Sequence, residues 1–217
     1  MLIETSQHVI SCRPACQDAV GVFERLDSTV LVVANGAGGI EDGELAAGAV
    51  VTAIREAATS QAGPVDWVQV LRNIDQAIGS GQSTACVVEV GADSLCGACV
   101  GDSRVGLLVG DAMIFPSDVQ AQKPLLGSHV AVPMPFSTSW SGSLLILASH
   151  GFWKAMRLEP LLASIHNLAF PVYARTCAEM VPLPSGAVAD DVNVICARRP
   201  VAKPVTRRIS LIEDEQD

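Results

Sequence analysis

The spacing of hydrophobic and polar residues changes several times along this chain. Near the start, apolar residues alternate with polar ones or form short runs separated by Pro, Asp and Ser, which is typical of strands. From Asp42 the apolar residues instead recur every three or four positions, as on one face of a helix. The pattern predicts strands at residues 4–11, 19–25, 28–34, 84–90, 94–101, 104–109, 144–148 and 192–197, and helices at 42–57, 65–78, 153–155, 159–166 and 172–180.

The order of these elements predicts the fold class. Blocks of strands flank two separate groups of helices, which favours two packed sheets covered by helices over an alternating βαβ series. Residues 110–142 are rich in Pro, Ser and Gly and carry few regular signals. We expect one domain over residues 1–199 and a charged, flexible C-terminal tail over residues 200–217.

Composition narrows the functional classes. Hydrophobic residues make up 49% of the 217 residues and charged ones 17%, so most of the chain is expected to pack into a core. The net charge of −9 argues against nucleic-acid binding, which needs clustered Lys and Arg. Because the sequence has neither a membrane-length apolar run nor a signal-peptide pattern at its start, we expect a cytoplasmic protein without a membrane partner.

Seven cysteines raise the question of a metal or redox site. Cys96 and Cys99 have the CxxC spacing, but a strand over these residues directs side chains three positions apart to opposite faces. No second CxxC completes a zinc ligand set. Core packing of reduced thiols is the preferred interpretation, and a cysteine-rich metal-binding module is the weaker alternative.

A glycine-rich turn follows the apolar run 30–34 and begins with Asn35 and Gly36. Such a turn at the end of a buried strand lets the backbone approach a ligand closely, because glycine has no Cβ. Asn35 alone would be interpreted as an ordinary turn residue. The turn lies within 33–39 (VANGAGG). Six other short segments also carry polar or charged residues: 13–19 (RPACQDA), 42–46 (DGELA), 83–85 (STA), 100–104 (VGDSR), 145–153 (LILASHGFW) and 189–194 (ADDVNV).

Together and in this order, these segments resemble the motifs of the protein phosphatase 2C (PPM-type) serine/threonine phosphatases. The resemblance implies a four-layer αββα sandwich with two mainly antiparallel sheets. It also implies Mg²⁺ or Mn²⁺ held by carboxylates, with a metal-bound water that attacks phosphoserine or phosphothreonine. Arg13 matches the phosphate-binding arginine, Gly36 the backbone-carbonyl ligand, Asp18 and Asp190 metal-site carboxylates, and Asp102 the aspartate of an additional metal.

The chain departs from the family motifs at three metal-site positions. Asn35 replaces the bridging aspartate, His150 replaces the aspartate of the SDG motif, and Gln17 replaces a glutamate. An amide cannot offset the repulsion between two dications, and imidazole is a poor ligand for Mg²⁺. The resemblance therefore implies a degraded metal centre. For Asp102 and Arg104, an ion pair or a turn cap is the alternative interpretation, and for His150 a polar strand-end residue.

These departures favour a pseudophosphatase that regulates signalling by binding a phosphorylated protein or a protein kinase. Mg²⁺ or Mn²⁺ would then bind weakly or not at all. The alternative is an active serine/threonine phosphatase with an unusual metal site. Ser210 follows Arg207 and Arg208 as in sites of basophilic kinases, so its phosphorylation is a further hypothesis beside that of a plain solvated tail.

Overall fold

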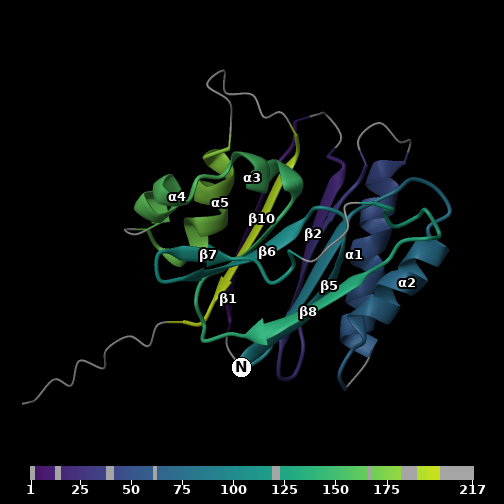
Figure 1. The fold of residues 1–217 in the computed structure, drawn as a ribbon, viewed down its shortest axis with the longest axis horizontal. Helices are drawn as coiled ribbons and strands as arrows, with labels where there is room; N and C mark the ends of the chain where they lie inside the picture. Colours follow the sequence, from purple (N-terminus) through teal and green to yellow (C-terminus); the bar gives the residue numbers. More distant parts are fainter. Residues whose placement is uncertain are drawn as a thin grey trace, which may run out of the picture.

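Two five-stranded antiparallel sheets form the centre of the molecule (Figure 1). The computed structural model describes residues 3–12, 16–37, 42–60, 63–118, 123–165, 168–181 and 190–200. The first sheet has the order β1-β10-β9-β6-β7 and the second the order β2-β3-β4-β5-β8. The strands are β1 (Glu4–Ile10), β2 (Asp18–Glu24), β3 (Thr29–Asn35), β4 (Ala85–Val90), β5 (Ser94–Val100), β6 (Arg104–Val109), β7 (Ala112–Ile114), β8 (Met134–Ser139), β9 (Leu145–Ala148) and β10 (Val192–Arg198).

Helices cover the outer face of each sheet (Figure 1). Apolar side chains of α1 (Gly43–Ser60) and α2 (Trp67–Ala77) pack on the second sheet. The first sheet is covered by α3 (His150–Ala155), α4 (Leu158–Ile165), the short 3-10 helix η1 (Phe170–Val172) and α5 (Tyr173–Glu179). The sequence-based prediction of a four-layer αββα sandwich is confirmed.

Strand β3 is almost wholly apolar because both of its faces are covered. Leu31 and Val33 face the other sheet, whereas Val30 and Val32 face α1 and α2, and all four are fully buried. A strand that is covered on both faces has no solvent side, so the apolar/polar alternation is lost. The run ends at Asn35, which is only partly buried, and this places a polar side chain at the end of the sandwich.

The prediction missed two strands within residues 110–142. Strand β7 has three residues, and β8 has the sequence MPFSTS, with a proline and several polar positions. Both strands lie at the edge of a sheet, where proline and polar side chains are tolerated because one side of the strand makes no ladder. Their sequences therefore lack the apolar pattern that marks the central strands.

The connection between β7 and β8 is attached to α2 by a buried carboxylate. Asp75 is 2% exposed, and its Oδ1 accepts hydrogen bonds from the backbone N–H of Gly127 (2.8 Å) and of His129 (3.0 Å). Its Oδ2 accepts a third bond from the N–H of Ala131 (3.0 Å). Residues 127–131 of this connection are therefore anchored to α2 by three hydrogen bonds to one carboxylate.

The prediction of core cysteines is only partly correct. Cys96 and Cys99 do point to opposite faces of β5, but only Cys99 is buried and Cys96 is exposed. Cys96 lines a groove beside the last residues of α1, so its thiol faces this groove instead of the core. Since the two thiols cannot share one ion, this CxxC does not form a metal site.

No helix within the described ranges is long and apolar enough to cross a membrane. Residues 201–217, including Ser210, lie outside the described residues, and so does Arg13.

Candidate metal centre

Most of the predicted site residues gather at one end of the sandwich. Asp18, the first residue of β2, is paired with Asn35, the last residue of β3. Asp102 lies in the turn between β5 and β6, and His150 opens α3 directly after β9. Asp190 lies two residues before β10. The fold thus brings together the ends of strands that are distant in the sequence, as the resemblance implies.

Gly36 is required by the packing of backbone against backbone. A Cβ built on Gly36 would lie 2.3 Å from the carbonyl oxygen of Gly43 and 2.8 Å from that of Gln17. The N–H of Gly36 also donates to the Gln17 carbonyl at 2.8 Å. The close approach at this glycine is therefore made by the first residue of α1 and by the chain before β2.

The first turn of α3 is fixed in a similar way. A Cβ on Gly151 would lie 2.5 Å from the carbonyl oxygen of Asp191. The fully buried Ser149 Oγ accepts a hydrogen bond from the N–H of Asn193 (3.0 Å) and donates to the Asp191 carbonyl (3.3 Å). These contacts lock the end of β9 to the start of β10, so they hold His150 in place between them.

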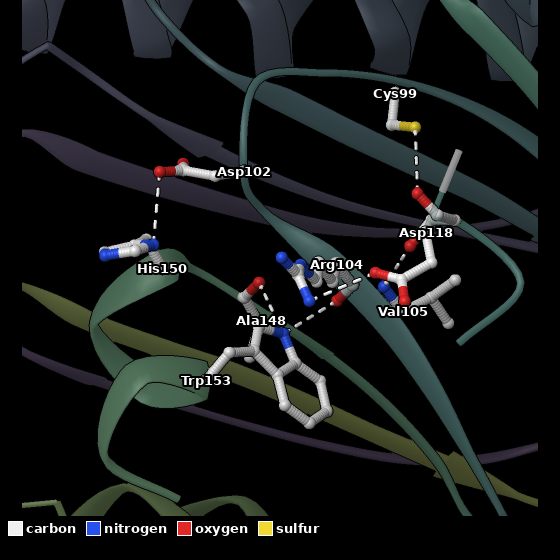
Figure 2. Close-up of polar contacts among 9 residues, drawn as sticks. Cys99, Asp102, Arg104, Val105, Asp118, Ala148, His150 and Trp153 are labelled. Carbon is white, nitrogen blue, oxygen red and sulfur yellow. Dashed lines mark hydrogen bonds and ion pairs between the residues drawn. The ribbon is translucent and has the colours of Figure 1, made fainter. Parts of the chain in front are cut away.

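The side chains of His150 and Asp102 are in direct contact. His150 Nδ1 lies 3.1 Å from Asp102 Oδ2, and the two side chains are 40% and 30% exposed. Figure 2 shows the contact, with the second ring nitrogen of His150 pointing away from Asp102. The partner of Asp102 is therefore the histidine that replaces a family carboxylate.

Arg104, next to this pair in the sequence, has a different partner. Its Nη1 lies 3.1 Å from Asp118 Oδ1, and both side chains are substantially exposed. The indole N–H of Trp153 donates to the carbonyl oxygens of Arg104 and of Ala148, each at 3.1 Å (Figure 2). These contacts attach α3 to β6 and β9. Arg104 therefore has a structural role and takes no part in the Asp102–His150 pair.

Asp18 is the most perturbed carboxylate of the site. Burial raises its pKa to about 8, and the charges of Asp191, Asp190 and Asp102 act in the same direction. The Ser149 hydroxyl lies close enough to lower the pKa slightly, but neither carboxylate oxygen has a partner with good hydrogen-bond geometry among the described residues. At neutral pH the side chain is therefore mostly protonated.

Asp191 is a site residue that the sequence did not reveal. Its Oδ1 accepts from the N–H of Cys12 (2.7 Å) and from Ser11 Oγ (3.3 Å), and its Oδ2 accepts from the N–H of Gln17 (2.9 Å). Burial acts to raise its pKa, but the hydrogen bonds from Cys12 and Gln17 outweigh burial and the pKa is lowered. The sequence could have indicated Asp191, because it is a second acid next to Asp190 at the start of a buried strand.

The described donors do not fit a two-metal centre. Asn35 offers an amide where the resemblance implies a bridging carboxylate, and Asp102 is paired with His150. Asp190 is exposed, and its Oδ1 accepts the N–H of Asp191 at 3.0 Å. Among the residues that the structure describes, no three or more His, Cys, Asp or Glu side chains are grouped so that they could hold a metal ion.

Comparison with known proteins gives no match at the level of sequence. No family model matches the chain, and no curated protein matches it.

Solved structures, in contrast, match over most of the chain. Serine/threonine phosphatase Stp1 from Staphylococcus aureus superposes with a TM-score of 0.80 at 15% identity, over 93% of this chain and 96% of that one. The catalytic domain of the phosphatase PstP, in complex with two manganese ions, gives 0.73 at 19% identity, over 90% and 97%. A protein of the bacterial stressosome, a modular system adapted to control secondary messenger signalling, gives 0.74 at 21% identity, over 91% and 100%. The chain has the fold of the bacterial phosphatases of the 2C type.

Proposed function

We propose that this chain, which has the fold of the bacterial serine/threonine phosphatases, is a pseudophosphatase that regulates signalling by binding a phosphorylated protein or a protein kinase in the cytoplasm. The observation that carries the proposal is the contact between His150 Nδ1 and Asp102 Oδ2 at 3.1 Å. Both residues occupy positions for which the resemblance implies metal carboxylates. The imidazole of His150 replaces one of these carboxylates and contacts the other, Asp102.

The charge balance supports this proposal. Two dications about 4 Å apart repel each other by roughly 17 kcal/mol at an effective dielectric constant of about 20, so a two-metal centre needs several carboxylates around it. Asn35 and His150 contribute no negative charge, and Gln17 replaces a third anion. Hard ions such as Mg²⁺ gain little from amide or imidazole ligands in compensation. Efficient metal-dependent hydrolysis is therefore not expected.

The class of partner is inferred from the neighbouring structures. They are serine/threonine phosphatases and a component of the bacterial stressosome. A protein that keeps this fold and loses the metal ligands would keep surfaces that recognise phosphorylated regulatory proteins.

The proposal predicts that turnover and metal affinity depend on the missing carboxylates. The wild-type protein should bind Mn²⁺ weakly and show no Mn²⁺-dependent turnover of a phosphoserine peptide. The double variant Asn35→Asp, His150→Asp should bind Mn²⁺ at least tenfold more tightly, which corresponds to about 1.4 kcal/mol. Titration calorimetry and phosphate release measure the two quantities.

A variant with Asp190→Ala added to these changes is the matched control and should lose the gain in affinity. Mn²⁺-dependent turnover by the wild-type protein that Asp190→Ala abolishes would refute the proposal. No gain in the double variant would mean that the geometry around the site has diverged as well.

The second candidate is an active phosphatase with an unusual metal preference, and one observation favours it. Asp18 is mostly buried and both its carboxylate oxygens are without hydrogen-bond partners among the described residues, as in a ligand that awaits a cation. The same measurements on the wild-type protein, repeated with Mg²⁺, Mn²⁺, Zn²⁺ and Co²⁺, separate the two candidates.

A further inference from the structure

A groove of about 810 Å³ lies at the end of the sandwich opposite the candidate metal centre. It is formed by the turn between β2 and β3 (residues 24–28), the last residues of α1 (58–60), residues 63–65 and the facing ends of β4 and β5. In Figure 1 this is the end of α1 away from the start of α3. The groove shares no residue with the candidate metal centre, so a role for it is independent of the proposed function.

The floor of the groove is built from a closed polar network. Arg25 Nε lies 3.1 Å from Glu89 Oε1, and the guanidinium also donates to the carbonyl oxygens of Ala58 (2.7 Å) and Gly63 (2.6 Å). Glu89 Oε2 accepts the indole N–H of Trp67 at 3.0 Å. The side chains of Arg25 and Glu89 are only 8% and 14% exposed. The floor is therefore rigid before anything binds.

The remaining lining is acidic and apolar. Since Arg25 is neutralised by Glu89, the exposed Glu24 and Asp27 leave the groove with a net negative charge. Leu26 at the rim is 91% exposed, and the Cys96 thiol is exposed within the groove. A suitable occupant carries basic side chains next to aliphatic ones.

The described chain ends beside this groove. Arg199 Nη2 lies 3.1 Å from Asp93 Oδ1, and the guanidinium carbon lies 5.3 Å from the centre of the Trp140 ring. Asp93 lies in the turn between β4 and β5, and Gly91 of this turn and Ser94 at the start of β5 line the groove. These contacts fix the point from which residues 201–217 depart.

The sequence after Pro200 has the required chemistry. Lys203, Arg207 and Arg208 are followed closely by the aliphatic residues Ile209, Leu211 and Ile212. An extended chain advances about 3.3 Å per residue, so the seven residues from Pro200 to Arg207 span up to ~23 Å. The segment can therefore extend from Arg199, which contacts Asp93, toward the groove.

We propose that residues 203–212 bind in this groove within the same molecule. The basic side chains face Glu24 and Asp27, and the aliphatic side chains cover Leu26 at the rim. The bound segment shields the Cys96 thiol from reagents in solution.

The test is the alkylation rate of Cys96 in the full chain, read by peptide mass spectrometry with Cys16 in the same sample as the reference. Arg207→Glu with Arg208→Glu should raise the Cys96 rate about threefold or more, because like charges then meet in the groove. Asp27→Arg alone should have the same effect. Combining the three substitutions should lower the Cys96 rate again relative to the Arg207→Glu, Arg208→Glu variant, because the charge introduced at position 27 then attracts those at positions 207 and 208.

Glu215→Lys is the matched control, since it reverses a charge of the same segment outside residues 203–212, and it should leave the Cys96 rate unchanged. Equal rates in the wild-type protein and in the Arg207→Glu, Arg208→Glu variant would overturn the proposal. Protection that disappears on dilution would overturn binding within one molecule, because it would identify the segment of a second copy as the occupant.

Discussion

At the scale of single residues, three acids around the candidate metal centre are already stabilised by protein groups or by a proton. Asp102 is paired with His150, and Asp191 is held by hydrogen bonds from Cys12 and Gln17. Asp18 keeps its proton at neutral pH because it is buried beside other carboxylates. These contacts and this proton lower the negative charge that a cation at this site would meet.

Asp18 gives a prediction about the pH dependence of stability. Its folded-state pKa of about 8 lies above the ordinary value of 3.8, so the unfolded chain loses this proton first as the pH rises. Stability should therefore fall between about pH 4 and pH 8. Asp18→Asn removes the effect and should be more stable than the wild-type protein at pH 8, by on the order of 2–4 kcal/mol, with the difference vanishing near pH 4.

Urea denaturation at several pH values measures this difference. The exposed Asp111 offers a control, because Asp111→Asn should leave the pH dependence as it is in the wild-type protein. A stability difference between Asp18→Asn and the wild-type protein that does not change with pH would contradict a raised pKa at this position.

At the scale of elements, the contacts between glycines and neighbouring backbone decide how the strands and helices meet. Gly36 allows the end of β3 to touch the start of α1, and Gly151 allows α3 to begin against the chain before β10. The sequence shows these glycines, but it does not show which segment each one contacts. The resemblance predicted where the glycines belong in the fold, and only the structure identified their partners as protein backbone.

Two glycines with different surroundings give a second prediction. Gly36→Ala should destabilise the protein by about 1–3 kcal/mol, because the new Cβ would lie 2.3 Å from the Gly43 carbonyl oxygen. Gly48→Ala should instead stabilise it by about 0.4–1 kcal/mol, since Gly48 lies within α1 and nothing lies within 4 Å of its Cβ position. The two free energies of unfolding should therefore change in opposite directions, and a neutral Gly36→Ala would contradict the close packing around Gly36.

The attachment of the β7–β8 connection to α2 gives a third prediction. Asp75→Asn replaces one accepting oxygen by an N–H₂ group that faces a backbone donor, so it should cost about 2–3 kcal/mol of stability. Hydrogen exchange should accelerate at the amides of residues 127–131.

Asp66→Ala at the start of the same helix is the control, since the Asp66 carboxylate caps α2 by accepting the N–H of Gln69. It should cost about 1 kcal/mol without changing the exchange of residues 127–131. Acceleration of equal size in both variants would mean that the loop responds to α2 as a whole and not to Asp75.

At the scale of the whole molecule, the sequence predicted the two packed sheets and most strand positions because the central strands are covered on both faces. It did not predict β7 and β8, whose edge positions remove that signal. It also missed Asp191, whose partner Cys12 is 179 positions away in the sequence. Contacts of this kind depend on the completed fold, so no local pattern marks them. The groove beside Arg25 was missed for the same reason.

The position of β10 between β1 and β9 also affects the order in which the chain can fold during its synthesis. The second sheet and its two helices lie between Asp18 and Ser139, so that half can assemble while the rest is still being made. β1 pairs with β10, and it therefore leaves the ribosome well before its ladder partner exists. Until residues 192–198 emerge, β1 has to be kept from pairing with other chains.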